Sequence, residues 1–124
     1  MRVLICDDDP VIRYLLTVVL GKRAGDDVIE VADADDVLGA ALEHRPDVIV
    51  LDYVMPNRDG ADVVIELRMD PVVGTIPVVF LTGRSDIAEE TLDEIAVAGL
   101  IEKPFDASKL HDRLEAFVAA NITP

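Results

Sequence analysis

The sequence has few cysteines, few aromatic residues and few cations. Its one cysteine, Cys6, lies inside the first apolar run and is interpreted as a small core residue with no disulfide partner. Aromatic residues make up 4% of the chain, so the 51% hydrophobic content comes mostly from Val, Ile, Leu and Ala. The 25 acidic residues outnumber the 11 Lys and Arg, which gives a net charge of −14. This charge argues against nucleic-acid binding by the chain, because phosphate backbones require clustered cations.

Long apolar runs are also absent. Every uncharged stretch is far shorter than the roughly 20 residues that a membrane-spanning helix needs, which predicts a soluble protein with no membrane contact. The N-terminal sequence MRVLICDDD holds only a short apolar run between Arg2 and three acids, too short for the apolar region of a secretory leader. We therefore expect a cytoplasmic location.

Short apolar runs alternate regularly with segments of helical spacing. The runs predict strands at residues 3–6, 28–31, 48–51, 78–81 and 100–101, and their continuous apolar character is typical of strands buried on both faces. A length of 124 residues suits one hydrophobic core. We predict a single domain over residues 1–121, with residues 122–124 as a tail or the start of a linker.

Helix-start signals follow the predicted strands. The positions where a helix favours a proline in its first turn or an acidic cap are occupied by Pro10, Asp33, Asp59, Asp86 and Asp106. Helices are expected after Pro10 and Asp33, over residues 59–69 and 87–98, and near the end of the chain. The alternation predicts an α/β fold of the (βα)5 type, with a parallel sheet and helices on both faces.

Polar residues stand where four of the predicted strands end. They are Asp7, Asp8 and Asp9 after the first strand, Asp52 after the third, Thr82 after the fourth and Lys103 after the fifth. Each alone has an ordinary interpretation as a helix cap, a strand residue or a solvated charge. Together they converge on the edge where parallel α/β sheets bind ligands. Because clustered carboxylates repel unless a cation or proton holds them, we interpret the group as a functional site.

The residue types at this edge indicate phosphoryl chemistry. Carboxylate oxygens without an accompanying His or Cys cluster favour Mg²⁺ or a similar ion that keeps part of its water shell. The positive charge of Lys103 and the hydroxyl of Thr82 suit phosphate oxygens. A carboxylate can itself be the nucleophile and form an aspartyl phosphate.

Four segments of the sequence carry a family resemblance. LICDDDP, VIVLDYVMPNRDG, PVVFLTG and LIEKPFD resemble, in order and spacing, the signature segments of response regulator receiver domains, the chemotaxis regulators among them. The resemblance covers essentially the whole chain. It implies a flavodoxin-like, doubly wound sheet with strand order 2-1-3-4-5, and a signalling phosphoprotein of two-component systems rather than an enzyme.

The resemblance also implies a role for each site residue. Asp52 would accept the phosphoryl group from a phosphohistidine on a sensor histidine kinase or phosphotransfer protein. Asp8 and Asp52 would bind Mg²⁺ directly, Asp7 would bind it through water, and the backbone carbonyl of Val54 would complete the protein ligands. Lys103 would pair with the phosphoryl oxygens.

The remaining implications concern the switch. Thr82 would move to hydrogen-bond the phosphoryl group, and a cis peptide bond before Pro104 would aim the lysine. The signal would pass to the segment of residues 87–100, which would bind an unknown downstream protein, and the chain would be a monomer or a phosphorylation-dependent dimer. Asp9 is interpreted as a helix-entry residue outside the metal shell.

Some positions depart from the family pattern or carry no signal. Leu100 stands where the family usually has an aromatic residue that takes part in the switch. Val54 and Arg84 flank the expected approach of a hydrolytic water, and an apolar Val54 predicts slow self-dephosphorylation. His44 and His111 are expected to face solvent without partners.

Two other functions stay open at this point. The chain could be a receiver-like interaction module that is not phosphorylated, although such modules usually lose one or more of the site residues that this sequence keeps. It could also be a haloacid-dehalogenase-like phosphatase, with Asp7 and Asp9 after the first strand, Thr82 and a later lysine. That reading leaves Asp52 unexplained, and no acidic pair follows Lys103 to bind the metal.

Overall fold

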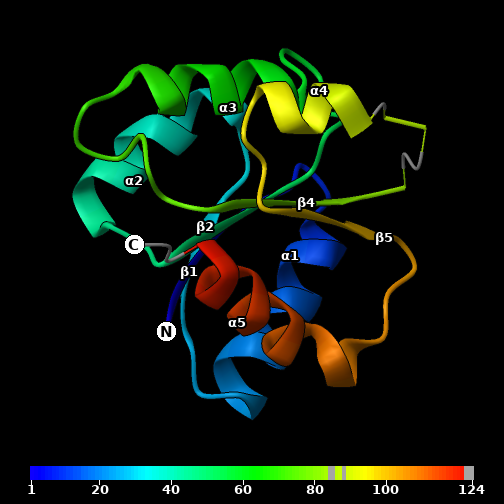
Figure 1. Ribbon diagram of the computed structural model, residues 1–124. Coiled ribbons are helices and arrows are strands. Elements are labelled where there is room, and N and C mark those ends of the chain that lie inside the picture. The colour runs from blue at the N-terminus through cyan, green and yellow to red at the C-terminus, as the bar shows by residue number, and fades with distance from the viewer. Residues whose placement is uncertain (84–85, 88, 122–124) are drawn as a thin grey trace.

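A parallel sheet organises the chain in the computed structural model, which describes residues 1–83, 86–87 and 89–121. Its five strands lie in the order β2-β1-β3-β4-β5 (Figure 1). The strands are β1 (Arg2–Cys6), β2 (Asp27–Val31), β3 (Val48–Leu51), β4 (Val78–Thr82) and β5 (Gly99–Glu102). The order confirms the predicted flavodoxin-like sheet, and each predicted strand agrees within one residue at either end.

Helices cover both faces of the sheet. In chain order the helical segments are α1 (Pro10–Leu16), the π-helical η1 (Thr17–Arg23), the 3₁₀ turn η2 (Ala34–Asp36), α2 (Val37–His44), α3 (Gly60–Met69), α4 (Glu89–Glu94), the 3₁₀ turn η3 (Ala107–Lys109) and α5 (Leu110–Asn121). Figure 1 shows α1 and α5 on one face, and α2, α3 and α4 on the other. None of the helices among the described residues is long and apolar enough to cross a bilayer.

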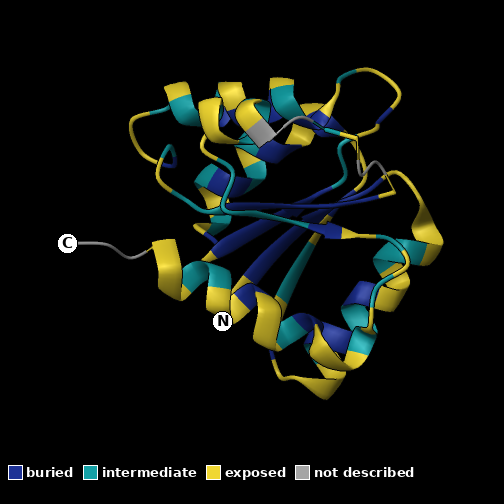
Figure 2. Cartoon of the chain, turned by 45° about the vertical axis from the view of Figure 1, so that its right-hand side comes forward, coloured by how far each residue is buried: buried dark blue, intermediate teal, exposed yellow. Residues whose placement is uncertain are grey.

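The strands contribute side chains to two hydrophobic cores, because successive side chains of a strand point to opposite faces of the sheet. In β1, Leu4 and Cys6 join the core under α2 and α3, whereas Val3 and Ile5 join the core under α1 and α5. All of β1 after Arg2 is buried, and so is all of β3 (Figure 2). This double burial explains why the central strands appear in the sequence as unbroken apolar runs. Burial also raises the pKa of the Cys6 thiol to about 12, in agreement with a core role.

Four helix starts agree with the prediction, and the expected start at Asp86 stays a prediction because residue 88 lies outside the described residues. The side chains of Asp9, Asp33, Asp59 and Asp106 accept hydrogen bonds from backbone amides at the starts of α1, η2, α3 and η3. Pro10 stands at the first position of α1. The proposed tail at residues 122–124 lies outside the described residues.

The fourth helix is shorter than predicted. The sequence favoured a helix over residues 87–98, but α4 covers only Glu89–Glu94. Ala96 adopts a left-handed backbone with φ of +56°, and the Ala98 amide already donates to the Val78 carbonyl at 2.8 Å. Pairing with β4 therefore ends the helix before its apolar pattern ends.

His111 contradicts the expectation that it faces solvent without partners. Its Nδ1 lies 2.6 Å from Oδ2 of the buried Asp26, and its Nε2 lies 3.3 Å from Oε2 of Glu115. Asp26 also accepts a hydrogen bond from the N-terminal amino group of Met1 at 3.0 Å. Sequence reasoning missed the contact because 85 positions separate His111 from Asp26. His44 is half-buried, with its Nε2 3.7 Å from the neighbouring Glu43.

The His111–Asp26 contact predicts a pH-dependent stability. The hydrogen bond to Asp26 raises the pKa of His111 above its ordinary value of about 6.5. A raised pKa in the folded state stabilises the protein below the unfolded pKa, and this contribution is lost as the pH rises through the folded value. We therefore expect the free energy of unfolding in urea to fall as the pH rises above about 6.5.

His111→Gln should flatten this fall, whereas the control His44→Gln should leave it unchanged. An identical pH profile in wild type and His111→Gln would contradict the assignment. The Met1 amino group, whose pKa is also raised by Asp26, titrates at higher pH, so the comparison is made below pH 8.

Candidate functional site

The backbone hydrogen bonds of the sheet position the two inner carboxylates. Asp7 follows β1 directly, and its amide donates to the Val31 carbonyl at 3.3 Å. Asp52 follows β3, and its amide donates to the Cys6 carbonyl at 3.0 Å. Because β1 and β3 are neighbours in the sheet, these bonds bring the two aspartates to the same edge. The predicted convergence of Asp7 and Asp52 is confirmed.

Asp7, Asp8 and Asp52 form a cluster. Each offers a carboxylate oxygen, and the three oxygens lie within 4.8 Å of one another. Asp7 is buried, Asp52 is half-buried and Asp8 is exposed, so the cluster opens to solvent on one side. An all-oxygen set with an open side suits Mg²⁺, which prefers oxygen ligands and keeps several waters. The residues present therefore fit this ion.

Lys103 neutralises part of the negative charge of the cluster. Its Nζ donates to Oδ2 of Asp7 at 2.8 Å and to Oδ2 of Asp52 at 3.3 Å. The Lys103 amide donates to the Thr82 carbonyl at 2.9 Å, which ties the end of β5 to the end of β4. The peptide bond between Lys103 and Pro104 is cis, as the family resemblance implied.

Burial and charge shift the pKa values of two of these groups. Burial raises the pKa of Asp7, although hydrogen bonds from Lys103 and the Asp9 amide oppose the rise. Burial lowers the pKa of Lys103, but its contacts with Asp7 and Asp52 outweigh that effect and raise the pKa above the ordinary value. Lys103 therefore stays a cation at neutral pH, in a cluster that attracts positive charge.

Backbone amides and one guanidinium hold the two strand-end loops in place. The Asp9 amide donates to Oδ1 of Asp7 at 2.9 Å, and the Val54 amide donates to Oδ1 of Asp52 at 3.2 Å. Arg13 donates from Nη1 to the Asp7 carbonyl at 2.7 Å. Sequence reasoning missed Arg13. Arg13 stands in the last turn of α1, where a cation is ordinary, so no sequence signal pointed to this contact.

The loop after β3 is closed tightly by Gly60. The Gly60 amide donates to the Tyr53 carbonyl at 2.6 Å. A Cβ on Gly60 would lie 2.8 Å from the Phe80 ring and 2.9 Å from the Tyr53 Cα, so the position accepts only glycine without a shift of the loop. Met55 is buried and its sulfur lies 3.6 Å from the Cys6 sulfur, which confirms a packing role.

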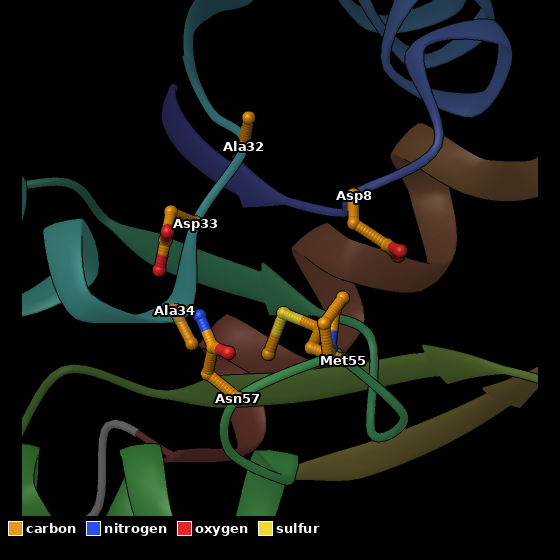
Figure 3. A pocket seen from close by; sticks show the side chains of 7 residues that line it. Asp8, Ala32, Asp33, Ala34, Met55 and Asn57 are labelled. Carbon is orange, nitrogen blue, oxygen red and sulfur yellow. The ribbon is translucent and has the colours of Figure 1, made fainter.

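A small pocket of about 60 Å³ lies beside Asp8, between the start of η2 and the loop after β3. Figure 3 shows Asp8 on the segment that leaves β1, with Met55 and Asn57 on the loop opposite Ala34. The pocket belongs to the same edge as the cluster and gives solvent access there.

Thr82 and Leu100 lie where the sequence placed them. Thr82 is the last residue of β4 and is 1% exposed, next to the backbone of Lys103. Leu100 pairs with Phe80 across the sheet and packs on the core under α3. Asp9 caps α1 through a hydrogen bond from the Val11 amide. The metal-ligand role of the Val54 carbonyl stays a prediction, and Arg84 lies outside the described residues.

Sequence comparison assigns the family. The profile of the response regulator receiver domain matches residues 3–115, which is most of the chain. The chain therefore belongs to the response regulator receiver domain family, as the four signature segments predicted.

Individual relatives agree with this family. The chain is 35% identical over 121 residues to the DNA-binding response regulator MtrA of Mycolicibacterium smegmatis, covering 97% of this chain and 51% of that protein. It is 35% identical over 120 residues to the transcriptional regulatory protein PdtaR of Mycobacterium tuberculosis, covering 95% of this chain and 57% of that protein. The chain thus spans about half the length of these curated relatives. The chemotaxis response regulator CheY4 of Vibrio cholerae superposes with a TM-score of 0.85 at 29% identity, covering 94% of this chain and 97% of that one.

The carboxylate cluster predicts stabilisation by Mg²⁺. MgCl₂ at about ten times its dissociation constant should raise the free energy of unfolding by about 1.4 kcal/mol, because the ion would bind the folded state and not the unfolded chain. Urea denaturation with and without MgCl₂ at constant ionic strength measures the effect. Asp8→Asn should abolish it, and the control Asp93→Asn, an exposed acid on α4, should retain it. An equal Mg²⁺ response in both variants would mean that the ion binds elsewhere.

Proposed function

We propose that the chain is a phosphoacceptor switch in which Asp52 receives a phosphoryl group. The observation that carries this proposal is the cluster itself, in which a half-buried Asp52 lies beside two further carboxylates and the Lys103 ammonium. Neither capping nor strand packing requires such a group of charges at one edge. The role is that of a stoichiometric acceptor and not of an enzyme that turns over a substrate.

The chemistry is a phosphoryl transfer between two nucleophiles. A carboxylate oxygen of Asp52 attacks the phosphorus of a phosphohistidine and forms a P–O bond. The P–N bond breaks, its electron pair returns to the imidazole nitrogen, and that ring takes up a proton. The product is an acyl phosphate on Asp52, and the Lys103 ammonium, 3.3 Å from Oδ2 of Asp52, would neutralise charge on the transferred oxygens.

Mg²⁺ is the proposed cofactor. Asp8 and Asp52 would bind it directly, Asp7 through water, and the Val54 carbonyl would complete the protein ligands. When bound, the ion supplies positive charge against the phosphoryl oxygens. The all-oxygen cluster and its open side support this assignment.

The donor is proposed to be a histidine kinase or phosphotransfer protein. Any donor must approach the open edge of the sheet, and helix α1 flanks this edge. Val11 is 71% and Tyr14 is 69% exposed on α1, and Leu15 borders a groove of about 340 Å³ whose lining includes Lys103 and Pro104. An exposed apolar surface beside the site supports docking of a protein donor.

The signal is proposed to leave through β4 and α4. Phosphorylation adds charge and acceptor oxygens near Thr82, whose hydroxyl would hydrogen-bond the phosphoryl group. The chain from Thr82 leads to α4, so a new position of Thr82 would bias the arrangement of that segment. Leu100 lacks a hydroxyl and packs in the core, so the output is expected to depend on α4 more than on a side-chain rotation at position 100.

The chain is proposed to act on proteins and not on nucleic acid. One relative is named as DNA-binding, but this chain spans about half of that protein and has a net charge of −14. Nucleic-acid contacts would therefore belong to the other half of such a regulator. A single buried thiol at Cys6 supports a reducing, cytoplasmic location. A monomer, or a dimer formed on phosphorylation, stays the expected state.

The proposal predicts one phosphoryl group per chain after incubation with Mg²⁺ and acetyl phosphate, measured by intact mass. Asp52→Asn should remove the increment because the nucleophile is lost. Asp59→Asn is the matched control, because Asp59 caps α3 and asparagine caps a helix equally well. Loss of the increment in both variants would contradict the assignment of Asp52.

No increment in the wild type, with stabilisation by Mg²⁺ intact, would instead favour an interaction module that is not phosphorylated. Release of inorganic phosphate from a phosphomonoester would favour the phosphatase. The complete set of Asp7, Asp8, Asp52, Thr82 and Lys103 supports the phosphoacceptor over either of these.

The proposed acyl phosphate should be long-lived. Val54 is 52% exposed two positions after Asp52, and its apolar side chain cannot orient a water for attack on the phosphorus. Val54→Gln should shorten the half-life several-fold, since an amide can position such a water. The decay of the phosphorylated mass after removal of acetyl phosphate measures the rate. A wild-type half-life of seconds, or no change in the variant, would contradict this reasoning.

A further inference from the structure

Helices α3 and α4 lie side by side on one face of the sheet, away from α1 and α5 (Figure 1). Between them runs a groove of about 350 Å³, which we call the α3–α4 groove. Its lining residues are Ile65, Arg68, Met69, Glu94, Ile95 and Ala96. The groove shares no lining residue with the carboxylate cluster or with the apolar surface of α1.

The α3 side of the groove exposes large apolar side chains. Met69 is 80% exposed and Ile65 is 47% exposed, one helical turn apart on the same stripe of α3. Val72, just beyond the helix, is 50% exposed. A surface helix normally directs such residues to the core and polar residues to solvent. A contiguous exposed stripe of this kind marks an interaction surface.

One guanidinium fixes the base of the groove. Arg68 donates from Nη1 to the Gly74 carbonyl at 3.1 Å and to the Ile76 carbonyl at 2.8 Å, and from Nη2 to the Ala96 carbonyl at 3.0 Å. These bonds join the end of α3, the segment before β4 and the turn after α4. The groove is therefore preformed, and a ligand would not have to order these segments on binding.

Acidic side chains border the groove. Glu94 lines it, and the exposed Glu90 lies one helical turn before Glu94 on the same side of α4. Arg68 is the one cation among the described lining residues, and its guanidinium is directed to three backbone carbonyls. An apolar floor with an acidic border is complementary to an apolar stripe with a basic border.

We propose that the α3–α4 groove binds a basic amphipathic helix of another protein, with large apolar side chains at i, i+3 or i+4, and i+7 facing the floor. A second copy of this chain fits less well, because each copy has a net charge of −14 and would bring the same acidic border. The proposal goes beyond phosphoryl transfer and holds whether or not Asp52 accepts phosphate.

The test uses a designed peptide as the probe. A fluorescein-labelled peptide of roughly four helical turns has Leu along one stripe and Lys at most other positions. Fluorescence anisotropy with the full chain should give saturable binding. A peptide of identical composition but scrambled order should bind much more weakly, because its leucines no longer share a face. A peptide with Glu in place of Lys should not bind.

Protein variants locate the site. Met69→Lys should weaken binding by about tenfold or more, because it places a charge in the apolar floor. Met69 is 80% exposed, so the variant should fold, and circular dichroism verifies this. Val11→Lys is the matched control, because it makes the same change at an apolar residue of α1 with similar exposure, and it should leave the affinity within about twofold. Met69→Lys should also take up phosphate from acetyl phosphate normally, which separates failure of the groove from failure of the phosphoacceptor.

Three results would overturn the proposal. Equal binding of the ordered and scrambled peptides would show attraction to the acidic surface alone. An equal loss in Val11→Lys and Met69→Lys would place the site elsewhere. Self-association in sedimentation experiments that Met69→Lys abolishes would show that a second copy covers the groove.

Discussion

The repulsion among the Asp7, Asp8 and Asp52 carboxylates is the interaction around which the rest of the site is arranged. The sheet brings two of them together through hydrogen bonds that continue the β1–β2 and β1–β3 ladders, and it buries Asp7 in doing so. The Lys103 ammonium offsets part of the repulsion at 2.8 Å and 3.3 Å. The arrangement is stable only with positive charge nearby, and this property is what makes the edge suited to a divalent cation and a phosphoryl group.

The proposed binding sites for the phosphodonor and for a target protein lie on two separate surfaces of the molecule. The apolar surface of α1 borders the carboxylate cluster, where a phosphodonor must come close to Asp52. The α3–α4 groove lies on the opposite face of the sheet, with the core under α3 and α4 between it and α1. A receiver that presents separate surfaces to donor and target can contact both without competition between them.

Much of this molecule could be predicted from its sequence, for physical reasons. The apolar runs predicted the strands because both faces of the sheet are buried, and the edge residues followed because parallel strands end together. The contact of His111 with Asp26 joins distant segments and left no local pattern. The contact of Arg13 with the Asp7 carbonyl is local, but it depends on a side-chain direction that the sequence does not show. The predicted length of α4 was wrong because the Ala98 amide pairs with β4, which ends the helix although the apolar spacing continues. The ligand role of Val54 depends on a carbonyl, which every residue type provides.

The hydrogen bonds of the Arg68 guanidinium also restrict how the neighbouring segments can move. It holds three carbonyls that belong to different segments, so the turn at Ala96 cannot move independently of Gly74 and Ile76. Breaking these bonds would leave the partly buried carbonyls of Gly74 and Ile76 and a partly buried cation unsatisfied, which costs more than displacing the segments together. The end of α4 and the chain entering β4 therefore behave as one rigid block. A disturbance that starts at the edge of the sheet would reach this surface as the displacement of a whole block, and not as the rotation of a single side chain.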